Sequence, residues 1–249
     1  MLLAMKAMIL AAGLGSRLGV LGRSTPKCLL PLLDNETILD HVIHKLIRFG
    51  VSEIIINTHH LAEQVEAHLK QRRYYDIAIH ISHEHELLDT GGGLKNVRRY
   101  FQEEPAFIVH NADIFCTANL SEAYQNHIEH GLTASLICMT RDSQRGLFVD
   151  ESKKITGWTG EQPPYKPHTS ERLLAFSGIS ICSPSIFDYM PDTDRFSIIE
   201  AFLAASRDTH KVSAYHIDAS TWADIGTPEK LATLQKQLRN KDRAYLCDI

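Results

Sequence analysis

The amino-acid sequence predicts an α/β fold with three layers and a mixed, mainly parallel sheet. Two observations lead to this prediction. Short apolar runs, typical of buried strands, alternate with amphipathic helical segments over the first eighty residues. After residue 140 the alternation ends, and a hairpin and a proline-containing segment follow. Because strand–helix–strand connections are right-handed and join parallel strands, we expect the first half of the chain to be Rossmann-like.

The first half contains five expected strands with helical segments between them. The strands are expected at residues 8–11, 53–57, 77–81, 106–110 and 132–139. The helices are expected at residues 37–47, 61–69, 94–101 and 121–130, with Gly50 and Gly131 as stop signals. The segment from His83 to Gly93, which ends in three glycines, is expected to be a loop.

The second half is less regular. It is expected to contain a hairpin (147–150 and 155–158), an irregular segment (159–172), a strand (174–182), a helix (196–206), a strand (212–217) and a closing helix (227–238). We therefore predict a single domain over residues 1–249. Its parts would be a front half at 6–139, a back half at 140–226, and a C-terminal helix and tail at 227–249.

Composition excludes several classes of protein. The 249 residues are 44% hydrophobic and 22% charged, as in a globular protein, and the net charge of -4 gives no electrostatic signature for nucleic acid. The five cysteines show no CxxC pairing, so we expect reduced thiols and a cytoplasmic location. The apolar N-terminus is too short to span a membrane, and Lys6 lies inside it rather than ahead of it, unlike a signal peptide. Residues 1–4 are expected to be an extension before the first strand.

The segment from Met8 to Pro31 has the features of a phosphate-binding loop. An apolar strand ends in a glycine loop around Gly13 and Gly15, and Arg17 and Lys27 follow with no acidic residue near them. Backbone N–H groups can approach an anion closely where side chains are absent. A dinucleotide-binding loop would need a third glycine and a helix directly after it, and a Walker loop would need GK[ST]. Neither is present, and we interpret the loop as a site for the phosphates of a nucleoside triphosphate.

The same segment resembles the opening motif of the sugar-1-phosphate nucleotidyltransferase family, LAAGxGTRLxPLTxxxPKPLxP. The matching positions, which fall in register without a gap, are Leu10-Ala11-Ala12-Gly13, Gly15-Ser16-Arg17-Leu18, Leu21, Pro26-Lys27 and Leu29. Three positions depart from the motif: Val20, Gly22 and Cys28 stand where the family has proline, threonine and proline.

Later segments continue the resemblance in the expected order. Residues 88–93 (LDTGGG) are similar to the family's LGTAGAL, 111–113 (NAD) to NGD, 176–179 (FSGI) to NAGI and 222–227 (WADIGT) to WxDxGT. Within the family the pattern looks closest to N-acetylmuramate-1-phosphate uridylyltransferases. The family's sugar-side EKP segment is not clearly present, and Tyr165-Lys166-Pro167 is the candidate to replace it.

The resemblance implies Mg²⁺-dependent transfer of a nucleotidyl group from a nucleoside triphosphate, UTP first, to a sugar 1-phosphate, N-acetylmuramate 1-phosphate first. It implies the following roles: catalytic Arg17 and Lys27; nucleotide-binding Ala11, Ala12, Gly13, Gly15, Glu84, Gly91 and Gly92; sugar-binding Asn111, Gly146 and Gly178; metal-binding Asp113 and Asp224. The two carboxylates each follow an expected strand, where ligands collect in open α/β sheets.

Other interpretations stay open at this point. An aspartate after a strand also caps turns, an arginine or lysine can be a solvated surface charge, and Gly91 to Gly93 could be a helix start with a close packing contact. The protein could instead be a guanylyltransferase for heptose or mannose 1-phosphate. A third possibility is a catalytically silent regulatory subunit that binds a nucleotide-sugar. The oligomeric state is not predicted.

Overall fold

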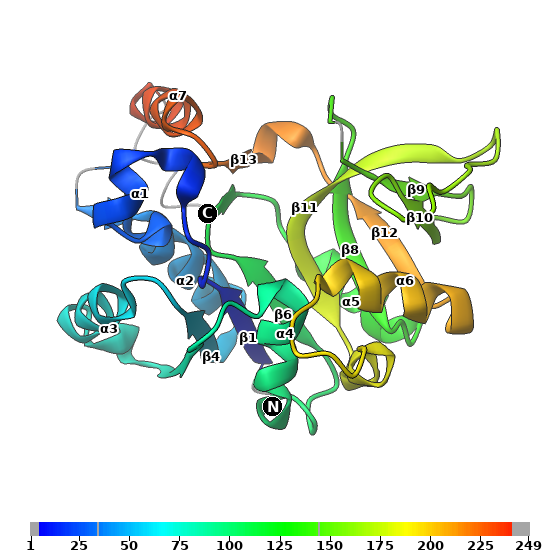
Figure 1. Cartoon of the computed structure of the whole chain (residues 1–249), viewed down its shortest axis with the longest axis horizontal. Helices are drawn as coiled ribbons and strands as arrows, with labels where there is room; N and C mark the ends of the chain where they lie inside the picture. Colours follow the sequence, from blue (N-terminus) through cyan, green and yellow to red (C-terminus); the bar gives the residue numbers. More distant parts are fainter. Residues whose placement is uncertain (1–4, 34, 144, 241–249) are drawn as a thin grey trace. The chain divides into compact units, whose positions relative to one another are not determined.

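The computed structural model describes residues 5–33, 35–143 and 145–240, and it has the predicted α/β class with a mixed sheet. The expected extension at residues 1–4 and the tail at 241–249 lie outside the described residues. The backbone forms two compact units, and each is described by itself (Figure 1). The first contains the described parts of residues 1–87, 110–117 and 220–249, and the second contains residues 88–109 and 118–219. The division of one domain after residue 139 stays a prediction.

The first unit is built on three parallel strands in the order β1-β4-β5. They are β1 (Met5–Leu10), β4 (Val51–Thr58) and β5 (Ala78–His83). The isoleucines at positions 54–56 of β4 are fully buried, as expected for a strand covered on both faces. The helices of this unit are α1 (Val20–Ser24), α2 (Ile38–Arg48), α3 (Ala62–Gln71) and α7 (Pro228–Arg239). The expected strand–helix–strand–helix–strand order is therefore confirmed.

A buried polar network joins α2 to α3. Thr37 and Asp40 form a capping box that starts α2, which explains why the helix begins there. The Asp40 carboxylate is also 3.0 Å from His68 Nε2 and 3.0 Å from Arg72 Nε. Burial alone would raise the pKa of Asp40, but hydrogen bonds from His68, Tyr75 and Thr37 bring it well below its usual range. The helix ends before Gly50, whose φ of 99° only glycine adopts readily.

Two pairs of short antiparallel strands complete the first unit. They are β2 (Pro31–Leu33) with β3 (Glu36–Thr37), and β7 (Ile114–Cys116) with β13 (Trp222–Asp224). None of the four was predicted, since two or three residues are too few for a periodic pattern. Strand β6 (Phe107–Asn111) contributes its last two residues to this unit and the others to the second.

The second unit is built on strand β8 (Ala134–Met139), which pairs in parallel with β12 (Val212–His216) and antiparallel with β11 (Arg172–Cys182). The expected hairpin is present as β9 (Leu147–Val149) and β10 (Ile155–Trp158), and β9 also pairs with β11. The helices are α4 (Asp89–Asn96), α5 (Ser121–Glu129) and α6 (Ile198–Thr209). Helix α6 packs against β10 and β12.

The structure corrects two sequence expectations. The three glycines at 91–93 lie inside α4 rather than in a loop before a helix at 94–101, and residues 98–100 form a separate 3-10 turn. The reason is packing: a Cβ on Gly91 would lie 2.3 Å from the ring of Phe196, so α4 fits there only without side chains. In addition, residues 20–24 form the short helix α1, where no helix was expected.

The remaining short 3-10 helices are Ser16–Leu18, Lys27–Leu29, Arg73–Asp76, Pro184–Tyr189 and Ala219–Thr221. In the described part of the chain, none of the helices has the length and apolar composition needed to cross a membrane.

Candidate active site

The predicted catalytic and metal-binding side chains all belong to the first unit. Arg17 lies in a 3-10 turn after the glycine loop, and Lys27 begins the next such turn. Asp113 lies between β6 and β7, and Asp224 is the last residue of β13. Because β7 and β13 are paired, the Ile225 N–H donates to the carbonyl oxygen of Asp113 over 3.1 Å. The two aspartates are thereby brought to the same end of this strand pair.

Lys27 forms an ion pair with Asp113. The two residues are 86 positions apart in the sequence, so this contact is made only by the fold. Their side chains are 13% and 28% exposed, which leaves the pair partly open to solvent. A short lysine–carboxylate contact of this kind places a fixed positive charge directly beside a carboxylate that is expected to bind metal.

Asp224 is held on both oxygens. Its Oδ1 accepts from the Gly226 N–H over 2.9 Å, and its Oδ2 accepts from Lys230 Nζ over 2.6 Å. Burial by itself would raise the pKa of Asp224, but the hydrogen bonds from Lys230 and Gly226 and the charge of Lys27 lower it. The turn-capping interpretation is therefore correct for one oxygen, while the carboxylate stays ionised at neutral pH.

Gly226 has a second effect, on Arg17. A Cβ on Gly226 would lie 2.6 Å from Asp224 Oδ1 and 3.4 Å from Arg17 Nη2. Glycine is thus needed at this position for the carboxylate and the guanidinium to lie on either side of the turn. The Arg17 guanidinium, with five N–H donors in a planar fork, therefore lies at the same turn as the Asp224 carboxylate.

The two carboxylates suit a magnesium ion. Mg²⁺ is usually held in proteins by one or two carboxylates, with substrate phosphates and waters as its other ligands. Asp113, directly before β7, and Asp224, at the end of its partner β13, supply that number. Within the described ranges there is no group of three or more His, Cys, Asp or Glu side chains that could hold a metal. Two carboxylates are a donor set that Mg²⁺ uses when substrate phosphates supply its other ligands.

The beginning of the glycine loop is fixed by a hydrogen-bond chain from β4. The Ala11 N–H donates to Asn57 Oδ1 over 2.7 Å, and Asn57 Nδ2 donates to Glu84 Oε1 over 2.6 Å. Asn57 and Glu84 are 3% and 2% exposed. Glu84, predicted to lie near the nucleobase, thus anchors the residue that holds the loop.

The end of the loop packs tightly on itself. A Cβ on Gly22 would lie only 2.3 Å from the carbonyl oxygen of Gly15, which has a φ of 63°. This contact explains the glycine at 22, one of the three departures from the family motif.

The other two departures are Cys28 and Val20. Cys28 is buried, and burial raises the pKa of its thiol to about 12, so the thiol stays protonated and packs as a small apolar group. Nothing in the structure explains Val20, which is exposed.

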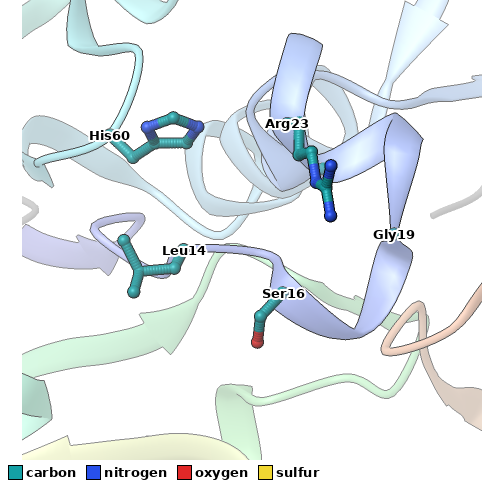
Figure 2. A pocket seen from close by; sticks show the side chains of 6 residues that line it. Leu14, Ser16, Gly19, Arg23 and His60 are labelled. Atoms are coloured by element: carbon teal, nitrogen blue, oxygen red, sulfur yellow. The ribbon is translucent and has the colours of Figure 1, made fainter.

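A cavity of about 240 Å³ lies beside the loop. Figure 2 shows that Leu14, Ser16 and Arg23 reach it from the loop and α1, while His60 reaches it from the segment after β4. Gly19 and Gly22 complete its lining. The cavity is therefore bordered by residues of the loop that was predicted to hold the triphosphate.

The predicted residues of the second unit are placed by packing. Gly91 and Gly92 both direct their N–H groups at the carbonyl oxygen of Phe196, at 3.0 and 3.4 Å. A Cβ on Gly146 would lie 2.8 Å from Leu173, and Gly178 has a φ of 82° within β11. Each glycine thus has a structural reason, and its contact with base or sugar stays a prediction.

Asn111 ends β6 and is partly exposed, in the first unit with Asp113. Lys166 is exposed in the irregular segment of the second unit. Their predicted roles toward the sugar also stay predictions.

Sequence reasoning missed three residues of the site: Asn57, Gly226 and Lys230. Gly226 lies inside the WADIGT segment, so its spacing from Asp224 could have pointed to it. Asn57 ends a buried strand as a polar residue, which is a weak signal for a site at the strand end. Lys230 was missed because its partner, Asp224, lies outside the helix, and a single lysine near a helix start does not by itself indicate a contact.

Comparisons with known proteins identify the family of the chain. The family model described as nucleotidyl transferase matches residues 6–241. The chain is 29% identical over 238 residues to the D-glycero-alpha-D-manno-heptose 1-phosphate guanylyltransferase of Aneurinibacillus thermoaerophilus, covering 95% of this chain and 99% of that one. It is 28% identical over 242 residues to the N-acetylmuramate alpha-1-phosphate uridylyltransferase of Caulobacter vibrioides, covering 91% and 94%.

Among solved structures, HddC from Yersinia pseudotuberculosis complexed with GMP-PN has a TM-score of 0.73 at 22% identity, covering 94% of this chain and 99% of that one. This likeness confirms the fold.

Proposed function

The chain belongs to the nucleotidyl transferase family and is a sugar-1-phosphate nucleotidyltransferase, and we propose that it transfers the uridylyl group of UTP to N-acetylmuramate 1-phosphate. The products would be a nucleoside-diphosphate sugar and pyrophosphate. One observation carries the nucleotidyl transfer: two carboxylates, a lysine and an arginine lie together in the first unit beside a glycine loop. The choice of UTP and N-acetylmuramate 1-phosphate rests on the motif pattern of the sequence. That set has the charges that phosphoryl chemistry requires.

The reaction is a displacement at phosphorus. A phosphate oxygen of the sugar 1-phosphate attacks the α-phosphorus of UTP and forms a new P–O bond. The bond from the α-phosphorus to the bridging oxygen breaks, and its electron pair leaves with pyrophosphate. A phosphate monoester has its second pKa near 6, so the nucleophile is largely a dianion at neutral pH and needs no general base. The barrier is therefore electrostatic, since two anions must meet in line.

The side chains of the site have complementary tasks in this scheme. Arg17 binds the β- and γ-phosphates with its planar fork of donors, which matches phosphate oxygens. Lys27, now paired with Asp113, neutralises charge at the α-phosphate and the incoming sugar phosphate. Asp113 and Asp224 would hold Mg²⁺, which supplies positive charge to the phosphate oxygens when it is bound. The N–H groups of Gly13 and Gly15 face the triphosphate from the loop.

Base and sugar recognition form the finer part of the proposal. Glu84, Gly91 and Gly92 are assigned to the nucleobase, together with Ala11 and Ala12 at the start of the loop. Asn111, Gly146 and Gly178 are assigned to the sugar, with Lys166 as the candidate for the family's sugar-side lysine. The cysteines at 28, 116, 138 and 182 are buried, and we assign the protein to the cytoplasm, where thiols stay reduced.

A second candidate is guanylyl transfer to heptose 1-phosphate. It is favoured by one observation, the similarity over nearly the full length of both chains to the heptose 1-phosphate guanylyltransferase. The two candidates use the same charged residues and differ only in base and sugar, so substrate assays separate them.

The test is a panel of UTP, GTP, CTP and ATP against N-acetylmuramate, heptose, mannose and glucose 1-phosphates, read as pyrophosphate release. The first candidate requires the highest kcat/KM with UTP and N-acetylmuramate 1-phosphate. Preference for GTP with heptose 1-phosphate would establish the second. If no pair gives turnover but a nucleotide-sugar binds, the catalytically silent subunit is the correct description.

A further inference from the structure

The side chain of Lys230 occupies an oxygen that the proposed metal would need. Its Nζ lies 2.6 Å from Asp224 Oδ2, while the other oxygen of that carboxylate accepts from the Gly226 N–H. An ammonium proton and a metal ion compete for the same lone pairs of a carboxylate. Mg²⁺ would therefore bind to a carboxylate whose Oδ2 already accepts a hydrogen bond from the Lys230 ammonium group.

The start of α7 explains how Lys230 reaches Asp224. Thr227 caps the helix, and its hydroxyl oxygen accepts from the Lys230 N–H over 3.4 Å, while Pro228 occupies the first turn. Side chains on a helix lean toward its N-terminus. Lys230 is thereby directed back across the first turn toward the end of β13.

The two lysines of the site differ in how easily each can break its ion pair with an aspartate. Lys27 and Lys230 each pair with one aspartate, so that each carboxylate of the metal-free site has a cation beside it. The side chain of Lys27 is only 13% exposed, whereas that of Lys230 is 49% exposed. A half-exposed lysine loses little when it exchanges a carboxylate for water, because exposed ion pairs contribute at most about 1 kcal/mol.

We propose that Lys230 is a positioning residue that holds Asp224 in the metal-free enzyme and is displaced when the metal binds. The exchange sets the metal affinity of the site: Lys230 keeps the carboxylate oriented and its charge balanced, and it lowers the net gain of metal binding. No covalent bond changes. The inference rests on the proposed function, since it needs Asp224 as a metal ligand.

The test measures Mn²⁺ binding to the full chain by the electron paramagnetic resonance signal of free Mn²⁺, with UTP absent. Lys230→Met removes the competing ammonium but keeps a long side chain. Lys236→Met is the matched control, since Lys236 lies exposed on the same helix. Lys230→Arg keeps a cation at the position. Thermal unfolding of each variant shows that the fold is retained.

The expected result is a Kd for Mn²⁺ that is lower in Lys230→Met than in the wild type, by up to about fivefold, as follows from losing one exposed ion pair. Lys236→Met and Lys230→Arg should bind as the wild type does. An unchanged or higher Kd for Mn²⁺ in Lys230→Met overturns the inference. If the wild type still binds Mn²⁺ in that case, the proposed metal site itself is not contradicted. If Asp224→Asn binds Mn²⁺ as tightly as the wild type, Asp224 is not a metal ligand and the inference fails. A wild type that binds no Mn²⁺ without UTP also overturns the exchange, whereas pyrophosphate release in the substrate panel tests the proposed function separately.

Discussion

At the scale of single residues, each charged side chain of the proposed active site contacts only one or two specific groups among the described residues. Asp113 contacts Lys27, Asp224 contacts Lys230 and the Gly226 N–H, and Arg17 lies beside the same turn. The three cations therefore differ in their surroundings. Arg17 lies at the Gly226 turn, Lys27 is mostly buried in its ion pair with Asp113, and the side chain of Lys230 is 49% exposed in its ion pair with Asp224.

The first prediction concerns the shape of the Arg17 side chain. Arg17→Lys keeps the charge but loses the planar fork, and one charge-assisted hydrogen bond contributes about 1.5–3 kcal/mol. We expect KM for the nucleoside triphosphate to rise about tenfold or more, measured by steady-state pyrophosphate release. Arg239→Lys, an exposed change at the end of α7, is the control. Equal KM values in the two variants would mean that Arg17 does not bind the triphosphate.

A residue of the site can be predicted from the sequence when it lies in a recognisable motif, but not when its only signal is a hydrogen bond to residues far away in the sequence. Arg17, Lys27, Asp113 and Asp224 were identified from motifs in register, and the fold brings them into one unit. Asn57 was missed because its two contacts, Ala11 and Glu84, lie 46 and 27 positions away. A hydrogen bond between distant residues leaves no local pattern, so only the folded chain shows it.

At the scale of elements, glycine decides where segments can approach. Gly22 lets α1 close onto Gly15, and Gly91 and Gly92 let α4 lie against residues 194–198. The start of α4 was predicted wrongly for this reason. Three glycines favour a loop by local propensity, but burial against Phe196 stabilises a helix that the local sequence does not favour. Long amphipathic helices such as α2 and α6 were predicted within a few residues, because packing and pattern agree there.

The second prediction tests the role of Gly22. In an ordinary exposed helix, replacing glycine by alanine stabilises by up to about 1 kcal/mol. Gly22→Ala should do the opposite, because its Cβ would lie 2.3 Å from the Gly15 carbonyl oxygen. We expect a lower Tm and a higher KM for the triphosphate, measured by calorimetry and by turnover. Ser24→Ala, in the same helix and exposed, is the control. A raised Tm in Gly22→Ala would show that the loop does not need this contact.

At the scale of the whole molecule, buried histidines link stability to pH. Burial lowers the pKa of His41, His110 and His127 to about 4. In the unfolded chain these groups titrate near 6.5. Between about pH 4 and 6.5 the unfolded state therefore binds more protons than the folded state, and the free energy of unfolding falls as the pH drops below 6.5.

The third prediction is the size of that effect. Each buried histidine contributes a loss of up to about 1.4 kcal/mol per pH unit within the window. Urea unfolding at pH 7 and 5.5 should show a clear fall in the free energy of unfolding. His110→Gln should flatten the dependence, whereas His85→Gln, at an exposed position, should not. A free energy of unfolding that is the same at both pH values would mean that these histidines are not buried in their neutral form.

The chain as a whole combines a predicted fold with a substrate choice that the sequence leaves open. The order of strands and helices follows from hydrophobic pattern, and the family follows from the match over residues 6–241. Base and sugar do not follow in the same way, because a guanylyltransferase and a uridylyltransferase are similar to the chain to almost the same degree, at 29% and 28% identity. The charged centre is common to both reactions.

The most direct test of that centre is pyrophosphate release by Asp113→Asn in the presence of Mg²⁺, with the substrate pair that the wild type prefers. Asparagine keeps the size of the side chain but removes the charge that faces Lys27 and the proposed metal. We expect turnover to fall at least about a hundredfold, as for the loss of a group that stabilises developing charge, while circular dichroism and Tm stay as in the wild type. Turnover equal to that of the wild type would contradict the assignment of Asp113 and, with it, the proposed centre for nucleotidyl transfer.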